Sequence, residues 1–255
     1  MTRHLLVIGA QRCGTTYVAS LLDSHPDVTL ARPARPEPKV FCSAESVSRG
    51  LAWYHRTYFA HATTEEVWAE KSTSYLESAD AAERARCVLG AADIVVVLRD
   101  PVARAVSNWR LSSASGLEDR PLEAALSENL VAPRPWDTSR TSVSPFAYLE
   151  RGHYVDQLGP WCAAFPGAVR VSLLEDLVSR ESAVGELYAR LGVDDTHRPP
   201  DRARQVNQSE GTTPELSAPL LTRLRGSFRD SDARLSAMLG RELPWPSVAG
   251  PRRSA

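Results

Sequence analysis

Cysteine is scarce in this chain, and the few cysteines lie far apart. The 255 residues contain four, and no two of them form a CxxC pair or a cluster with metal-ligand spacing. The six histidines show no such spacing either, so the sequence predicts no metal site. We expect the thiols to be reduced and mostly buried, as is usual in the cytoplasm. They are Cys13, Cys42, Cys87 and Cys162.

Excess charge and long apolar runs are also missing. A formal net charge of −1 gives no broad basic field, which argues against nucleic acid or an anionic membrane as a partner. The apolar run Leu5–Ala10 is too short for a signal peptide or a membrane span, and nothing else approaches a span. We therefore expect a soluble, cytoplasmic protein in which local basic residues bind any anionic ligand.

The sequence does contain apolar strands that alternate with helices. His4–Gly9 and Asp93–Leu98 are apolar runs of strand length, and Val169–Leu173 is a third candidate. Helical spacing follows each run, starting near Pro101 after the second and ending at Gly192 after the third. Such alternation produces βαβ units, so we expect an α/β fold with a central parallel sheet flanked by helices.

One domain over residues 1–245 accommodates this pattern, followed by a flexible tail over 246–255. A hydrophobic content of 43% is enough to build the core of a single α/β domain. Two proline-rich stretches, 31–39 and 129–145, are expected to be loops because proline interrupts both helices and central strands.

A glycine-containing loop follows the first expected strand. The chain here contains Gly9 and Gly14 five positions apart, between a strand and a helix. Such a loop can wrap an anion with its backbone amides and with the N-terminus of the helix. The lysine of a nucleotide-kinase P-loop is missing, and Arg12 inside the loop is a cation in its place. On its own, the pattern also fits an ordinary turn.

This loop resembles the 5′-phosphosulfate loop of sulfotransferases that use 3′-phosphoadenosine 5′-phosphosulfate (PAPS). The family usually has lysine followed by x-G-T-T, and Arg12 takes the lysine's position. The segment Ser24-His25-Pro26-Asp27-Val28 is typical of the carbohydrate branch, which includes the heparan sulfate sulfotransferases. The resemblance implies a bacterial, small-molecule type of this branch and donor contacts from six loop residues. They are Gln11, Arg12, Cys13, Gly14, Thr15 and Thr16.

A second motif follows the strand Asp93–Leu98. Arg99 stands at the end of this strand and Ser107 two turns into the next helix, so both side chains could converge on one anion at the sheet edge. The spacing is similar to the family's R-x7-S pattern, which implies that Arg99 and Ser107 bind the 3′-phosphate of PAPS. The alternative is a salt bridge between Arg99 and Asp100, with Ser107 on the helix surface.

Two further stretches resemble the family's reacting groups. The segment from Glu37 to Phe41, E-P-K-V-F, resembles E-P-H-F-F, which implies that Glu37 is the general base and that Lys39 lies on the substrate side. The segment from Glu70 to Tyr75, E-K-S-T-S-Y, resembles E-K-T-P-x-Y, which implies that Lys71 is a catalytic cation beside Arg12. Glu70 either orients Lys71 or replaces Glu37 as the base. The alternative for the first segment is a solvated charged loop, and for the second an exposed ion pair between Glu70 and Lys71.

The resemblance extends towards the end of the chain. Residues 209–212 correspond to a nucleotide-binding loop that has lost both of its basic residues, and the segment 239–245 matches a terminal G-R-x-x-x-W.

The resemblance implies a PAPS-dependent sulfotransferase that acts by in-line displacement, needs no metal and releases PAP. Its acceptor would be a hydroxyl, rather than an amine, of a small or sugar-containing molecule bound under the 129–145 loop and the 31–45 segment. The oligomeric state stays open. One alternative is an ATP-dependent kinase with Asp100 as magnesium ligand. Another is a non-catalytic nucleotide-binding module, which would place Glu37 and Lys71 far from the phosphate loop.

Overall fold

The chain forms two compact units, each built from two stretches of sequence. The computed structural model describes residues 2–137, 144–180, 182–200 and 215–246. Unit 1 comprises residues 1–99 and 157–208, and unit 2 comprises residues 100–156 and 209–255. The predicted extent of the domain, 1–245, and the predicted tail stay predictions.

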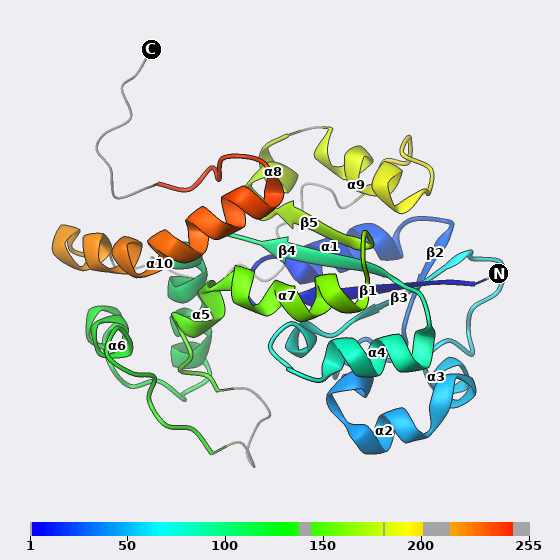
Figure 1. The fold of residues 1–255 in the computed structure, drawn as a ribbon, viewed down its shortest axis with the longest axis horizontal. Coiled ribbons are helices and arrows are strands. Elements are labelled where there is room, and N and C mark those ends of the chain that lie inside the picture. Colours follow the sequence, from blue (N-terminus) through cyan, green and yellow to red (C-terminus); the bar gives the residue numbers. More distant parts are fainter. Residues whose placement is uncertain (1, 138–143, 181, 201–214, 247–255) are drawn as a thin grey trace. The chain divides into compact units, whose positions relative to one another are not determined.

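A five-stranded sheet forms the centre of unit 1 (Figure 1). Every pair of neighbouring strands in it is parallel, in the order β2-β3-β1-β4-β5, so the predicted α/β class with a central parallel sheet is confirmed. The strands are β1 (Arg3–Gly9), β2 (Val28–Leu30), β3 (Val67–Lys71), β4 (Asp93–Leu98) and β5 (Val169–Leu173).

Three strands lie where the sequence predicts them, and two were not predicted. β4 and β5 have the expected bounds, and β1 begins one residue earlier. β2 has only three residues, and β3 ends in Glu70 and Lys71, so neither shows the long apolar run of a central strand.

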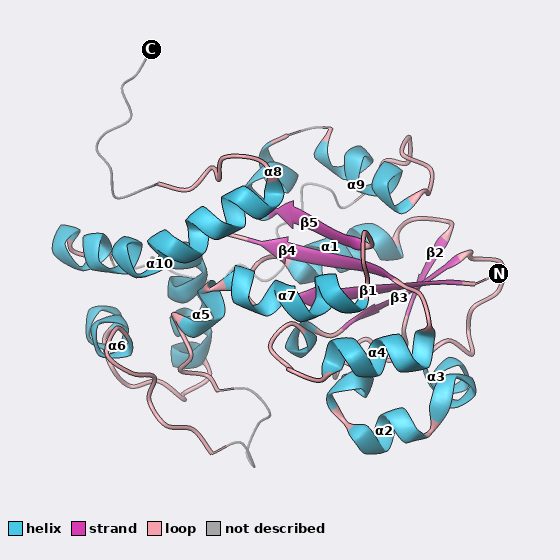
Figure 2. Ribbon diagram, in the orientation of Figure 1, coloured by secondary structure: helices cyan, strands magenta, loops and turns pink. Residues whose placement is uncertain are grey.

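Helices cover both faces of this sheet (Figure 2). In unit 1 they are α1 (Thr15–Asp23), α2 (Ala44–Ser48), α3 (Gly50–Tyr58), α4 (Ala81–Leu89), the larger part of α7 (Tyr154–Ala164), α8 (Leu174–Ser179) and α9 (Ala183–Leu191). On one face, α1, α8 and α9 share an apolar cluster with Val7 of β1 and Val97 of β4. On the other face lie α4 and α7, drawn in front of the sheet in Figure 1. A sheet apolar on both faces requires this double cover.

The single helix predicted between β5 and Leu191 is two helices, α8 and α9. Leu177 of α8 and Leu187 of α9 are both buried in the same apolar cluster, and the break between the helices lets each bury its own apolar side. The expected end at Gly192 is confirmed, because this residue caps α9 with a left-handed φ of 64°.

Unit 2 consists of helices around its own apolar cluster, which includes Val102, Leu126 and Phe228. Its helices are α5 (Pro101–Ala114), α6 (Leu122–Asn129), the first turn of α7 and α10 (Ala218–Leu239). Asp100 caps α5 by accepting a hydrogen bond from the Val102 amide at 2.8 Å, and its carboxylate pairs with Arg225 at 2.6 Å. Asp100 is therefore held as a helix cap, which does not fit the magnesium ligand of the kinase alternative.

The loops follow the prediction where the structure describes them. Residues 31–39 form neither helix nor strand, and neither do residues 130–137. Residues 138–143, the segment 209–212 and the tail from 247 onward lie outside the described residues. No helix in the described ranges is long and apolar enough to span a membrane.

The prediction that most cysteines are buried was wrong. Only Cys13 is buried, Cys42 and Cys162 are partly exposed and Cys87 is exposed, although all four are free thiols as expected. α4 buries its alanine side, including Ala85, and Cys87 lies away from that side.

Candidate functional site

The loop between β1 and α1 has the geometry of an anion-binding turn. It starts against β4, where the Ala10 amide donates to the Val97 carbonyl at 2.8 Å, and it ends at Gly14, the N-cap of α1. Gly14 has no side chain that could cap this helix by a hydrogen bond. The first amides of a helix lack intrahelical partners and attract anions. The turn before α1 therefore has the form of a loop that can bind an anion.

Both glycines of this loop are needed for its path. Gly14 has a φ of +86°, and a Cβ there would lie 2.5 Å from Leu174 Cδ1. A Cβ on Gly9 would lie 2.8 Å from the Cβ of Leu76, a side-chain atom fixed to the backbone. The turn is thus packed closely on both sides, which fixes the direction of the amides that follow it.

Three basic residues of unit 1 belong to the same edge of the sheet. Arg12 follows β1, Lys71 is the last residue of β3 and Arg99 comes directly after β4. β1 lies between β3 and β4, and Lys71 is in register with Val7. The carboxyl edge of a parallel sheet is where such folds bind ligands. The three cations predicted from separate motifs therefore come from adjacent strands.

The predicted base and the predicted second cation form an ion pair. Lys71 Nζ donates to Glu37 Oε1, and the Thr73 amide donates to Glu37 Oε2 at 2.9 Å. The Thr73 hydroxyl adds a third contact at 3.0 Å. The side chains of Glu37 and Lys71 are only 18% and 14% exposed, so water screens the pair weakly. The structure thus brings together a carboxylate able to accept a proton and a fixed positive charge.

Lys39 lies in a segment fixed by its backbone. Its amide donates to Ser72 Oγ at 2.9 Å, and the Phe41 amide donates to the Tyr75 hydroxyl at 3.2 Å. Lys39 has a left-handed φ of 51° and precedes a short 3-10 turn, Val40–Cys42. The backbone that carries the half-buried Lys39 side chain is therefore fixed by hydrogen bonds to residues 72–75.

Glu70 has a different place from the one expected. Its carboxylate is 0% exposed and accepts hydrogen bonds of 2.6 Å from the hydroxyls of Tyr54, Ser72 and Tyr75. Burial raises the pKa of Glu70, and the three hydrogen bonds partly oppose this effect. Successive side chains of a strand point to opposite faces, so Glu70 is directed away from Lys71. A group enclosed in this way fits neither a base for an acceptor molecule nor the group that orients Lys71.

Ser107 belongs to unit 2, and Arg99 belongs to unit 1. Ser107 lies within α5, and its side chain is partly exposed. Their convergence on one phosphate therefore stays a prediction.

Comparison with known proteins shows the family to which the chain belongs. The sulfotransferase domain family matches residues 2–168, more than half of the chain. The chain belongs to this family. The predicted family is thereby confirmed, and with it the prediction of a transferase.

Curated relatives of this sulfotransferase chain include heparan sulfate enzymes. Heparan sulfate glucosamine 3-O-sulfotransferase 3B1 of Homo sapiens is 26% identical over 94% of this chain and 64% of its own length. The bifunctional heparan sulfate N-deacetylase/N-sulfotransferase 1 of Mus musculus is 26% identical over 94% of this chain and 30% of its own length. The chain thus spans less than two thirds of either relative.

A solved structure supports the fold independently. A sulfotransferase from Alicyclobacillus acidocaldarius superimposes with a TM-score of 0.74 at 23% identity, covering 95% of this chain and 98% of that one. At this level of identity, the likeness shows a shared fold.

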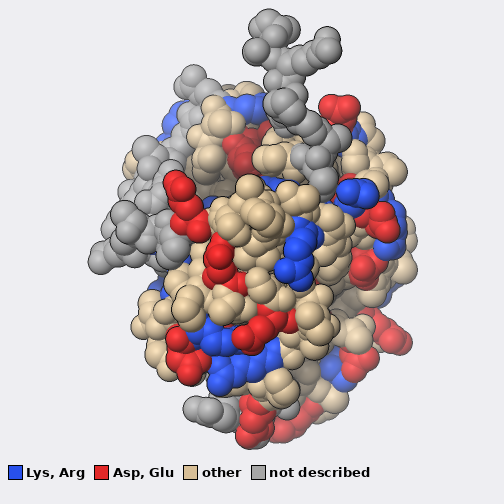
Figure 3. All heavy atoms as spheres, turned by 90° about the vertical axis from the view of Figure 1, so that its left-hand side faces the viewer, with Lys and Arg blue, Asp and Glu red and all other residues tan. Residues whose placement is uncertain are grey.

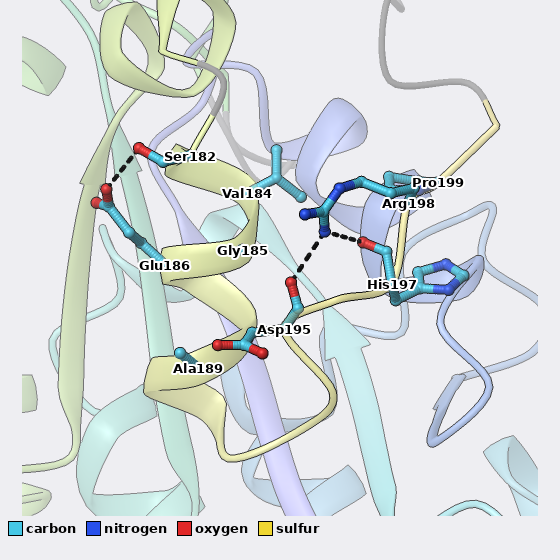
Figure 4. A pocket seen from close by; sticks show the side chains of 9 residues that line it. All are labelled: Ser182, Val184, Gly185, Glu186, Ala189, Asp195, His197, Arg198 and Pro199. Atoms are coloured by element: carbon cyan, nitrogen blue, oxygen red, sulfur yellow. Dashed lines mark hydrogen bonds between the residues drawn. The ribbon is translucent and has the colours of Figure 1, made fainter.

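A cavity in the sulfotransferase lies apart from the residues predicted for the reaction. It measures about 300 Å³ and is lined by α9 and the segment 195–199 (Figure 4). Arg198 donates to the carbonyls of Asp195 and His197 at 3.0 and 3.2 Å, so its guanidinium is used by the local backbone. No residue of the predicted site lines this cavity.

The structure adds residues that sequence reasoning missed, namely Tyr54, Ser72, Thr73 and Tyr75. The available signal was the run of hydroxyl side chains directly after Lys71. No group of three or more potential metal ligands occurs in the ranges that the structure describes.

Proposed function

We propose that the protein transfers the sulfuryl group of PAPS to a hydroxyl of a small or sugar-containing acceptor. One observation carries the proposal beyond family membership. The Glu37 carboxylate is paired with Lys71 on the strand beside the loop that precedes α1. A proton acceptor and a cation next to an anion-binding turn are the groups that sulfuryl transfer needs.

The residues of unit 1 fit the donor. The N-terminus of α1, which begins after Gly14, would receive the 5′-phosphosulfate, with Arg12 and Lys71 beside it. Arg99 at the same sheet edge would bind the 3′-phosphate, together with Ser107. PAPS supplies the activated sulfuryl group when it is bound.

In the proposed reaction, Glu37 takes the proton of the acceptor hydroxyl as the new S–O bond forms. The bond between sulfur and the phosphate oxygen breaks, and the leaving oxygen becomes negative. Once Glu37 is protonated, it no longer neutralises Lys71, so the ammonium charge becomes available to that oxygen. Arg12 would also stabilise the negative charge on the leaving oxygen. In this proposal, Arg12 and Lys71 neutralise the charge that Mg²⁺ neutralises in phosphoryl transfer.

Surface charge bears on the acceptor. Figure 3 shows basic and acidic side chains interspersed on the face that it presents. In unit 2, Arg120 is paired with both Glu118 and Glu128. A polyanion needs unpaired basic side chains in a row, so we favour a small hydroxylated acceptor over a long sulfated chain. A hydroxyl acceptor also fits the proposed role of Glu37, because a hydroxyl must lose its proton to a base when it is sulfated.

The donor is tested by thermal shift. A ligand that binds only the folded state stabilises it by about 2.7 kcal/mol at a hundredfold excess over Kd, which is roughly 5–10 °C for a chain of this size. We expect this shift with PAP and a small one with ATP and Mg²⁺. A larger shift with ATP and Mg²⁺ would favour the kinase alternative.

The acceptor is tested by a screen with sulfur-labelled PAPS. Matched pairs of hydroxyl and amino compounds, sugars and phenols would be incubated with the protein and PAPS. Label in the hydroxyl member of a pair supports the proposal. Label only in amines would replace O-sulfation with N-sulfation.

A further inference from the structure

A buried polar cluster connects the two segments that carry the reacting groups. At its centre lies Glu70, the only carboxylate with a 0% exposed residue surface among the described buried residues. Glu70 Oε1 accepts from the hydroxyls of Ser72 and Tyr75, and Oε2 accepts from the hydroxyl of Tyr54, each at 2.6 Å. The proposed transfer chemistry does not use this group.

The direction of these hydrogen bonds matters. A hydroxyl has one hydrogen, and in Ser72 and Tyr75 that hydrogen is directed at Glu70. Their oxygen lone pairs are then available, and they accept from the amides of Lys39 and Phe41 at 2.9 and 3.2 Å. A carboxylate can only accept, so it fixes both hydroxyls in the orientation that the two amides require.

The segment held in this way begins at the proposed base. Glu37 is two residues before Lys39, and its carboxylate meets Lys71 and Thr73. The two segments are thus joined on one side by Glu37 and on the other by the hydroxyls that Glu70 orients. Loss of the second connection leaves Glu37 on a loop of residues 31–39 that forms no helix or strand.

We propose that Glu70 is a positioning residue, which holds the 37–41 segment through Ser72 and Tyr75 and so keeps Glu37 on Lys71. The inference rests on the proposed role of Glu37 as base. Displacing a reacting group by about 1 Å can cost about a hundredfold in rate. We therefore expect Glu70→Leu, which has a similar size but accepts no hydrogen bond, to lower kcat by about 10–100-fold while the affinity for PAP changes by less than about threefold.

The chain contains a matched pair of tyrosines for the test. Tyr54 and Tyr75 are both fully buried, and both donate to Glu70 at 2.6 Å. Only Tyr75 also accepts an amide of the 37–41 segment, that of Phe41. Tyr75→Phe and Tyr54→Phe therefore remove the same bond to Glu70, but only the first releases the segment. Ser72→Ala, which frees the Lys39 amide, is the second variant if Tyr75→Phe does not fold.

Two measurements on the full chain test the proposal. The first is hydrogen exchange at the amides of Lys39 and Phe41, which needs no acceptor. We expect Glu70→Leu to increase exchange at both amides by about tenfold or more, and Tyr75→Phe to do so at Phe41. Tyr54→Phe should leave both unchanged. Equal protection in all variants, or equal loss in both tyrosine variants, would overturn the positioning role.

The second measurement is kcat with the best acceptor from the screen, in a double-mutant cycle. If Glu70 acts through Glu37, Glu70→Leu costs about 10–100-fold in the native background and little in the Glu37→Gln background. The same loss in both backgrounds would mean a merely structural effect and would refute the inference. Ordinary turnover of Glu37→Gln alone would instead refute the base role, and the exchange data would still decide whether Glu70 holds the segment.

Discussion

Replacing Glu37 by glutamine separates the chemistry of the proposed site from donor binding. Glutamine keeps the size of the side chain and can still accept from the Thr73 amide, which donates to Glu37 at 2.9 Å. It loses the negative charge that pairs with Lys71 and the ability to take up a proton. The change thus removes the charge and the basicity of the carboxylate and leaves the local packing.

The structure sets the expected magnitudes. Removal of a general base lowers kcat by roughly 10²–10⁴. Breaking a buried ion pair costs about 3–5 kcal/mol, and the 18% and 14% exposure of Glu37 and Lys71 reduces this towards about 1–2 kcal/mol, because Lys71 can still reach water. For a chain of this size, the Tm should fall by about 2–8 °C. PAP should bind at least as tightly, since Lys71 is then unpaired and a nearby negative charge is gone.

The assay combines turnover, PAP titration calorimetry and thermal unfolding on the same protein. The prediction requires a large loss of kcat, a PAP Kd that does not increase and a modest fall in Tm. Leu76→Val, a change in the adjoining core, is a control that perturbs packing without removing charge. Turnover of Glu37→Gln within about threefold of the unchanged protein would contradict the base assignment.

Three other changes test the donor site and the stability of each unit. Arg99→Ala should weaken PAP binding by roughly 2–4 kcal/mol in calorimetry, since a phosphate loses a charge-assisted partner, and an unchanged Kd would remove Arg99 from the donor site. Gly14→Ala should lower the free energy of unfolding by about 1–2 kcal/mol in urea, because of the positive φ and the approach of Leu174, and an unchanged midpoint would contradict this. Burial and then the charge of Asp100 raise the pKa of Asp232 to about 7. The folded state therefore binds this proton more tightly than the unfolded chain, and stability is lost as the pH rises from about 4 through 7. Asp232→Asn should raise the Tm at pH 8 and not at pH 4, and equal differences at both pH values would refute the assignment.

The sequence was most informative for the long apolar strands at the centre of the sheet. β1 and β4 are mostly apolar runs, and their bounds could be predicted because parallel central strands need such side chains. The edge strand β5 is partly exposed at four of its five residues and alternates apolar and polar side chains, which also predicts a strand. β3 could not be predicted, because its buried inner side includes Glu70 and its last residue is Lys71. A carboxylate in a core is possible only with hydrogen-bond donors, and here one of them comes from Tyr54, sixteen positions away.

Motif resemblance, and not periodicity, selected two residues that the structure brings into contact. Glu37 and Lys71 come from segments with no regular pattern, and the structure joins them in an ion pair. The same reasoning assigned Glu70 to the acceptor side, because adjacency in sequence suggests adjacency in space. In a strand the opposite holds, since neighbouring side chains point to opposite faces. Knowledge that residues 67–71 form a strand would have corrected this expectation.

The alternation along β3 also explains how two carboxylates can serve one site without sharing a role. Lys71 lies on the side of Glu37 and pairs with it, whereas Glu70 lies on the buried side and accepts from the hydroxyls of Tyr54, Ser72 and Tyr75. The charge of Glu37 is a minor cause of the raised pKa of Glu70, after burial. The two carboxylates thus differ in their partners: the proposed base Glu37 contacts a cation and Thr73, and the proposed positioning residue Glu70 contacts three hydroxyls. Two consecutive residues at the end of a strand can therefore have different proposed roles, Glu70 as the positioning residue and Lys71 as the catalytic cation.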